Sequence, residues 1–295
     1  MEIWHFTPAR YALGMQSHGK HLLSALLITA AGAAAQPRTV HFLSEDHKTN
    51  LVGFLFEPAS PGPHAAVVML HGRAGPYSSL AKGVYTANTL SQRHRQWGEF
   101  WSQRGYVALL VDSFGPRNFP AGFPAGSYDQ RPEEVSEQTV RPLDAYGALR
   151  YLRKRRDVIA DRIGVQGWSN GGMTVLVTMS RRAPGIEQPT PETGFRAAVA
   201  EYPGCGMAAV QGDYRNYAPL LLMIAGDDQE VSPQRCQEFA QKAKSAGNAL
   251  EAITYPGADH NFDDPGKTRQ AKANRRATED TMRRAEAFFG ARLLR

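Results

Sequence analysis

After Pro37 the sequence alternates regularly between short apolar runs and longer amphipathic runs, and this constrains the fold more than any other feature. Several short runs, such as 65–70 and 106–112, are apolar throughout, which is typical of parallel strands covered by helices on both faces. Strands that alternate with helices imply right-handed crossovers and one doubly wound sheet. The sequence therefore predicts an α/β fold with a mostly parallel sheet.

About eight segments have the length and composition of strands: 39–45, 51–57, 65–70, 106–112, 162–167, 196–201, 219–225 and 250–255. Helical patterns occur in 88–104, 137–155, 171–182, 233–246 and 268–293. No internal repeat or low-complexity linker interrupts this alternation. We therefore expect residues 37–295 to form a single domain.

Charge and motif content exclude several classes of function. The 34 Lys and Arg residues exceed the 28 Asp and Glu residues by 6, a mild excess that is spread along the chain, so we expect no nucleic-acid partner. The sequence contains no G-x-G-x-x-G, Walker or H-E-x-x-H motif, so neither a cofactor nor a metal site is expected. Two cysteines are too few for a disulfide-built scaffold.

The N-terminal 35 residues have the layout of an export signal. A polar, basic stretch after Met15 is followed by the apolar run 22–34 and by small residues at Ala33 and Ala35. Residues 1–14 precede this layout, so translation could start at Met15; the alternative is that the segment is an N-terminal helix of the domain. We expect cleavage after Ala35, a periplasmic or secreted protein, and no stable membrane anchor once the signal is removed.

Residues 167–171 (GWSNG) match the motif G-x-S-x-G. An apolar run leads into the motif and a helical apolar pattern leaves it, as required for a strand–turn–helix that exposes a serine above the sheet. The flanking glycines avoid clashes at a strained backbone, and the helix N-terminus favours developing negative charge. We therefore interpret Ser169 as a nucleophile rather than as a simple helix cap.

A serine nucleophile needs a base and an acid that orients the base. His260 follows the expected strand 250–255, and two aspartates, Asp227 and Asp228, follow 219–225. This chain order, Ser–Asp–His, is that of α/β-hydrolases, and ligand sites lie at the carboxyl ends of such strands. We favour Asp228 as the acid because Val231 would return the loop to the core, but Asp227 remains an alternative.

Two backbone N–H groups are candidates for an oxyanion hole. One belongs to Asn170, directly after the nucleophile, and the other to Arg73 in the turn HGRAG that follows strand 65–70. Such donors each contribute about 2.7–4 kcal/mol of transition-state stabilisation. The alternative is that HGRAG is only a tight turn.

Five segments together resemble the dienelactone hydrolase family of α/β-hydrolases. They are VVMLHGRAG, YVALLVDSFGPR, GVQGWSNGG, AGDDQEVSP and YPGADHNFDDP, and they occur in the family's order between about 65 and 265. The resemblance implies an α/β-hydrolase fold with Ser169 as nucleophile, Asp228 as acid and His260 as base. Founding members of the family use a cysteine nucleophile and a glutamate in the first oxyanion loop, whereas this chain has a serine and no glutamate in 71–81. The resemblance therefore implies a serine esterase of the same family.

The expected activity is hydrolysis of a small-molecule ester or lactone through an acyl-enzyme. A peptidase or acyltransferase could use the same three residues, and a non-catalytic binding protein could share the fold. The last alternative is less favoured because a binding module does not need all three residues.

The long segment 113–136 is rich in Gly, Pro and aromatic residues and follows a strand, so it could form a substrate wall or an ordered surface excursion. If Arg117 at its start and Arg73 both faced the pocket, they would bind an anionic substrate. Both could equally point outward.

Cys205 and Cys236 follow two strands that should be neighbours in the sheet. Export would allow a disulfide between them, which would close a loop near the acid. Two separate buried thiols are the alternative.

Overall fold

A computed structural model describes residues 36–268 and 271–295. The expected signal segment, residues 1–35, lies outside the described residues. The strands are β1 (Arg38–Leu43), β2 (Asn50–Phe56), β3 (His64–Leu70), β4 (Val107–Asp112), β5 (Val158–Trp168), β6 (Ala197–Glu201), β7 (Leu220–Ala225) and β8 (Leu250–Tyr255). The α-helices are α1 (Gln92–Gln103), α2 (Arg141–Arg153), α3 (Asn170–Thr178), α4 (Pro233–Ser245), α5 (Pro265–Thr268) and α6 (Lys272–Leu293).

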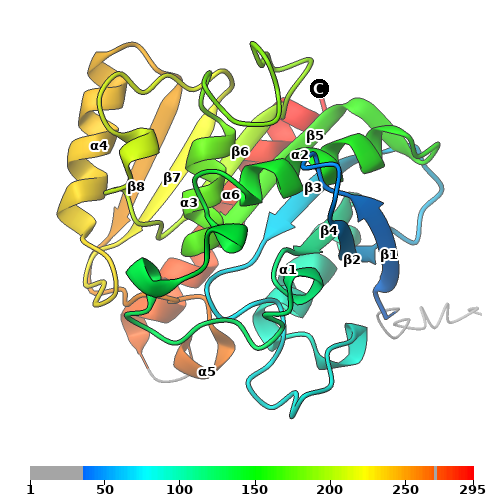
Figure 1. The fold of residues 1–295 in the computed structure, drawn as a ribbon. Coiled ribbons are helices and arrows are strands. Elements are labelled where there is room, and N and C mark those ends of the chain that lie inside the picture. Colours follow the sequence, from blue (N-terminus) through cyan, green and yellow to red (C-terminus); the bar gives the residue numbers. More distant parts are fainter. Residues whose placement is uncertain (1–35, 269–270) are drawn as a thin grey trace, which may run out of the picture. The chain divides into compact units, whose positions relative to one another are not determined.

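The eight strands form one sheet in the order β1-β2-β4-β3-β5-β6-β7-β8 (Figure 1). The pairs β1–β2 and β2–β4 are antiparallel, whereas the pairs from β4 to β8 are parallel. The predicted mostly parallel α/β-hydrolase sheet is confirmed. Each predicted strand corresponds to an observed one. The strand predicted at 162–167 begins earlier, at Val158, because Val158 already pairs with His64 of β3; the residues between Val158 and Ile163 form an irregularity in the pairing and are partly exposed.

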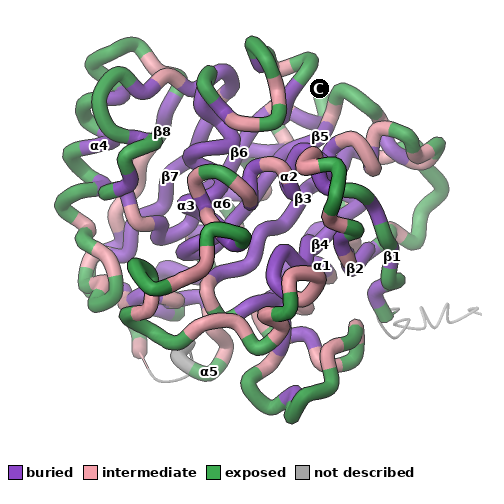
Figure 2. Tube along the Cα trace, viewed as in Figure 1, coloured by how far each residue is buried: buried purple, intermediate pink, exposed green. Residues whose placement is uncertain are grey.

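Two hydrophobic cores cover the two faces of the sheet. Side chains of β3 alternate between them: Ala66 and Val68 lie in the core with α2, α3 and α4, whereas Val67 and Met69 lie in the core with α1 and α6. Figure 2 shows the buried strands at the centre and exposed residues on the outer sides of the helices and on the loops. Burial on both faces explains why these strands lack a polar alternation.

The carboxyl ends of the parallel strands carry the segments singled out in the sequence. The turn with Arg73 follows β3, Ser169 follows β5, Asp228 follows β7 and His260 follows β8. Parallel strands bring these ends to one edge of the sheet, where α/β folds place their sites.

Candidate active site

Ser169 occupies the tight turn between β5 and α3. Its backbone has φ 52° and ψ −116°, a conformation that residues other than glycine rarely adopt. A Cβ atom on Gly171 would overlap the carbonyl group of Leu70, and one on Gly167 would overlap Gly171, so both flanking positions require glycine. The strained turn is held by a 2.9 Å hydrogen bond from the Ser169 N–H to the carbonyl of Glu201 on β6.

Ser169, His260 and Asp228 form a hydrogen-bonded row. The distance from His260 Nε2 to Ser169 Oγ is 2.8 Å, and the distance from His260 Nδ1 to Asp228 Oδ2 is 2.7 Å. Because an ionised carboxylate only accepts hydrogen bonds, Nδ1 donates to Asp228 and Nε2 is left to accept from the serine hydroxyl. This tautomer is the one that a general base for Ser169 requires.

The acid loop orients Asp228 rather than Asp227 toward the histidine. Asp228 Oδ1 accepts hydrogen bonds from the backbone N–H groups of Glu230 and Val231, at 2.8 and 2.9 Å, which leaves Oδ2 for His260. Asp227 is exposed, and its carboxylate accepts from the Gly257 N–H at 3.2 Å. Of the two aspartates left open by the sequence, Asp228 contacts the imidazole.

The turn after β3 lies against the nucleophile. A Cβ on Gly72 would lie 3.5 Å from Ser169 Cβ, and the next residue is Arg73. The N–H of Asn170 lies at the start of α3, where helical geometry leaves N–H groups without intrahelical partners. Both proposed oxyanion donors therefore belong to segments that adjoin Ser169.

His71 shapes the same turn and is not a base. Its Nδ1 donates to the carbonyl of Gly72 at 2.7 Å and its Nε2 accepts from the Ser113 N–H at 3.2 Å. The His71 carbonyl accepts from Arg141 Nη2 at 2.6 Å. Burial, together with the nearby Arg141 charge, holds the pKa of His71 well below its usual value, so the ring is neutral.

A cavity of about 700 Å³ opens beside Ser169. Its walls come from the segment after β4 (residues 125–131), the segment after β6 (residues 204–208), the acid loop and the start of α4. Part of the long segment 113–136 therefore forms a wall of the cavity. A volume of this size suits a small organic molecule.

Three arginines line the cavity, and two of them, Arg73 and Arg131, form ion pairs with glutamates. Arg73 forms a two-bond ion pair with Glu230, while Arg131 donates to Asn170 Oδ1 at 3.1 Å. Arg235 lies against Gly206 and has no ion-pair partner among the described residues. Arg131, Glu230 and Arg235 were not identified from the sequence, although Glu230 and Arg235 fall within and just after the acid-loop motif.

The expectation for Arg117 is corrected by the structure. The guanidinium forms two 2.8 Å hydrogen bonds with the buried Asp144, contacts Asp46 at 3.2 Å, and is 7% exposed. The side chain of Arg117 is therefore occupied by internal ion pairs, and it is not among the residues that line the cavity. It does not serve as a substrate-binding residue, because the buried Asp144 requires a cation.

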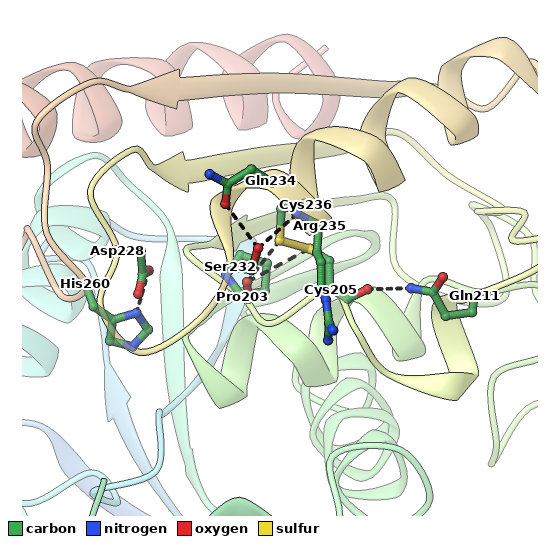
Figure 3. Close-up of a disulfide and its surroundings, with 9 residues drawn as sticks. All are labelled: Pro203, Cys205, Gln211, Asp228, Ser232, Gln234, Arg235, Cys236 and His260. Carbon is green, nitrogen blue, oxygen red and sulfur yellow. Dashed lines mark hydrogen bonds and ion pairs between the residues drawn. A yellow bond between two sulfur atoms is a disulfide. The ribbon is translucent and has the colours of Figure 1, made fainter. Parts of the chain in front are cut away.

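Cys205 and Cys236 form a disulfide with a Cα–Cα distance of 5.0 Å (Figure 3). Cys205 belongs to the cavity wall after β6, and Cys236 lies in the first turns of α4, which follows the acid loop. The two strands before them, β6 and β7, are adjacent and parallel, as expected from the sequence. The disulfide therefore links a wall of the cavity covalently to α4, the helix that follows the acid loop.

Two other features are absent from the part of the chain that the structure describes. No helix within 36–268 or 271–295 has the length and apolar character needed to cross a bilayer. The same part of the chain contains no group of three or more His, Cys, Asp or Glu side chains that could hold a metal ion.

Known proteins resemble this chain in sequence and in fold. The sequence profile of the dienelactone hydrolase family matches residues 51–293. A Bradyrhizobium protein named "Probable 2-oxo-3-(5-oxofuran-2-ylidene)propanoate lactonase" is 26% identical over 162 residues, which cover 55% of this chain and 64% of that protein.

Solved structures share the fold. A Klebsiella pneumoniae protein assigned as a dienelactone hydrolase superposes with a TM-score of 0.63 at 17% identity, covering 86% of this chain and 99% of the other. Native esterase 2 from Thermogutta terrifontis superposes with a TM-score of 0.61 at 18% identity, covering 88% and 93%.

Proposed function

Because this chain belongs to the dienelactone hydrolase family, we propose that it hydrolyses carboxylic esters or lactones through a serine acyl-enzyme. The observation that carries the proposal is the row of two short hydrogen bonds from Ser169 Oγ through His260 to Asp228, beside a cavity of about 700 Å³. The names of the Bradyrhizobium lactonase and the Thermogutta esterase support the same class of reaction.

The acylation half of the reaction follows from this geometry. His260 Nε2 accepts the proton of the Ser169 hydroxyl as Oγ attacks the substrate carbonyl carbon. Negative charge develops on the carbonyl oxygen, where the N–H groups of Arg73 and Asn170 stabilise it. When the tetrahedral intermediate collapses, the carbon–oxygen bond of the ester breaks and the leaving alkoxide takes the proton from His260.

Deacylation repeats the proton transfer with water. His260 takes a proton from a water molecule as its oxygen attacks the acyl carbon, and then returns a proton to Ser169 Oγ. Asp228 holds Nδ1 and stabilises the imidazolium in both halves of the reaction. The products are the carboxylic acid and the alcohol, which for a lactone are two ends of one molecule.

The guanidinium of Arg235 in the cavity wall has no ion-pair partner among the residues that the structure describes. It therefore favours substrates that carry a carboxylate, because arginine binds carboxylates through two parallel hydrogen bonds. This role replaces the one expected of Arg117. The Bradyrhizobium relative is named for a propanoate, which carries such a group.

The test of the proposed function compares turnover of a panel of esters, lactones and amides by the wild-type protein and by Ser169→Ala. We expect Ser169-dependent hydrolysis of esters or lactones. Faster turnover of amides would favour a peptidase, and faster transfer to added alcohols than to water would favour an acyltransferase. No Ser169-dependent turnover of any substrate would favour the binding-protein alternative.

We also propose that the protein is exported and cleaved after Ala35. The layout of residues 1–35 supports this, as does the disulfide, since disulfides persist mainly in oxidising compartments. Expression of the full chain in a bacterial host should give periplasmic or secreted protein whose N-terminal sequence begins at Gln36. An intact N-terminus on a protein retained in the cytosol would contradict export.

A further inference from the structure

A buried group of polar side chains holds the segment that carries His260. The carboxylate of Asp263, three residues after the histidine, is 0% exposed and accepts a hydrogen bond at each oxygen. Trp97 Nε1 donates to Oδ2 at 2.8 Å, and the hydroxyl of Tyr202 donates to Oδ1. Trp97 lies on α1 and Tyr202 directly follows β6, so one carboxylate joins the histidine segment to two other elements.

Arg93, also on α1, completes the group. Its Nη1 donates to Asn261 Oδ1 at 2.9 Å and to the Tyr202 hydroxyl at 3.1 Å, and lies 3.7 Å from Asp263 Oδ1. The cation compensates the cost of burying the Asp263 carboxylate. Asn261 has φ 59°, so the residue next to His260 is in a left-handed conformation while its side chain is held from α1. We call Arg93, Trp97, Tyr202, Asn261 and Asp263 the Asp263 cluster.

The Asp263 cluster contacts the catalytic imidazole through Tyr202. The rings of Tyr202 and His260 pack edge to face, with centroids 5.1 Å apart and an interplanar angle of 67°. The same tyrosine ring packs against Phe262, again with centroids 5.1 Å apart. Tyr202 itself has φ 37°, so its backbone is in a conformation that the surrounding contacts must maintain.

We infer that Asp263 and Tyr202 are positioning residues for His260 that keep both of its ring nitrogens within hydrogen-bond distance of their partners. The inference rests on the proposed function. Both proton transfers require the imidazole to bridge Ser169 and Asp228, and a displacement of about 1 Å can cost on the order of 100-fold in rate. The segment directly after His260 has few ways to move while Asn261 and Asp263 are held from α1.

Loss of this positioning should affect the turnover step rather than the binding of substrate. None of the five residues of the Asp263 cluster is among those that line the cavity beside Ser169. A loss of positioning should therefore lower kcat while KM changes little, because the cavity wall stays intact. Substitution of a residue that contributes only to stability would leave both kcat and KM of the folded protein unchanged.

The chain offers a matched pair of variants to test this. Tyr202→Phe removes the hydroxyl that donates to Asp263 and keeps the ring on His260. Tyr77→Phe removes a hydroxyl that donates to another buried carboxylate, that of Asp112, at 2.8 Å. Each variant leaves a buried carboxylate with one hydrogen bond fewer, but only the first carboxylate anchors the histidine segment.

We expect Tyr202→Phe to lower kcat about tenfold with KM changed less than threefold, and Tyr77→Phe to leave kcat within twofold of wild type. Asp263→Asn should lower kcat further, because the amide nitrogen that replaces one carboxylate oxygen cannot accept a hydrogen bond and the negative charge that faces Arg93 is lost. The kinetic parameters are measured on one ester and corrected for active enzyme by titration of the folded protein.

A second measurement does not need turnover. The proton on His260 Nδ1, shared with Asp228, gives a downfield proton NMR signal in the wild type, and we expect it to broaden or move in Tyr202→Phe and to stay in place in Tyr77→Phe. Equal kcat values for wild type and Tyr202→Phe, with this signal unchanged, would overturn the positioning role while leaving the hydrolase intact. A wild type without Ser169-dependent turnover would overturn both.

Discussion

Arg73 and Glu230 lie 157 residues apart in the sequence but form a two-bond ion pair, with Arg73 Nε 2.9 Å from Glu230 Oε2 and Arg73 Nη2 2.9 Å from Oε1. Arg73 carries one proposed oxyanion donor, and Glu230 Oε2 lies 3.8 Å from His260 Nε2. A third bond, from Arg73 Nη1 to the carbonyl of Phe123 at 3.2 Å, joins the long segment after β4 to the same arginine. The pair therefore links the turn after β3, the acid loop and the long segment after β4.

Glu230→Gln should lower kcat/KM for a neutral ester by about tenfold, because the turn that carries the Arg73 N–H loses its tie to the acid loop. The free energy of unfolding should change by less than about 1 kcal/mol, since ion pairs between partly exposed side chains are weak. Steady-state kinetics and urea unfolding measure the two effects.

Glu57→Gln is the matched control for Glu230→Gln. Glu57 forms a similar two-bond pair with Arg38, at 3.2 and 2.9 Å, and also pairs with Arg155 at 2.7 Å. It follows β2, at the edge of the sheet opposite the carboxyl ends of the parallel strands. Its activity should equal that of the wild type. Equal activity losses in the two variants would show that the Arg73–Glu230 pair has no specific role at the site.

Arg235→Gln should reduce the preference for substrates that carry a carboxylate. We expect kcat/KM for such an ester to fall about tenfold relative to its neutral analogue, which corresponds to about 1.4 kcal/mol of lost charge-assisted hydrogen bonding. Arg196→Gln, a change at another partly exposed arginine outside the cavity lining, is the control. An unchanged acidic-to-neutral ratio in Arg235→Gln would remove Arg235 as the anion contact.

Removal of the disulfide should destabilise the protein and leave the cavity wall less fixed. The cysteines are 31 residues apart, so the loss of the cross-link should cost about 3.5 kcal/mol if loop entropy dominates. We expect Cys236→Ser to lower the thermal midpoint, and reductant to lower that of the wild type but not that of the variant. Intact mass after alkylation in denaturant is the direct check: two alkylated thiols without reductant would rule out the bridge in the isolated protein.

Acid should destabilise the fold through its buried histidines. Burial and the nearby Arg93 charge lower the pKa of His94 to about 3, and the pKa of His71 is lowered as well. Since the unfolded chain has the higher pKa, about 6.5, it binds the proton first, so stability is complete above that pH and is lost as the pH falls toward 3. His94 alone should contribute a loss of about 2 kcal/mol between pH 7 and pH 5.

The variant His94→Asn isolates this contribution. The asparagine amide can still donate to the carbonyl of Pro76, which His94 Nδ1 contacts at 3.1 Å, but it does not titrate. The variant should be less stable than the wild type at pH 7 and should lose less stability between pH 7 and pH 5. Parallel pH dependences for the two proteins, from urea unfolding, would show that His94 is not responsible.

Much of the fold could be predicted because burial on both faces leaves an unbroken apolar run. The segments around β3, β4 and β7 needed no long-range information, and the glycines beside Ser169 mark a turn that only glycine permits. The meeting of Ser169, Asp228 and His260 at one edge of the sheet could be predicted for the same reason, since each residue follows a strand.

The ion-pair partners of the arginines could not be predicted, because each partner lies far away in the sequence. The sequence leaves Arg117 available for a substrate, yet the structure pairs it with Asp144, which is buried on α2. The sequence predicts an oxyanion role for the Arg73 N–H and allows its side chain to contact the substrate, whereas the side chain binds Glu230. Sequence patterns report which segments are buried but not which buried charges face each other.

Covalent labelling with a fluorophosphonate tests the central claim most directly. Intact mass and peptide mapping of the labelled protein should find one phosphonyl group on Ser169 in the wild type and in the control Ser102→Ala, and none in Ser169→Ala. Ester turnover by Ser169→Ala should fall by roughly 1,000-fold or more, as expected when a triad nucleophile is lost. Equal labelling and equal turnover in the wild type and Ser169→Ala would contradict the account.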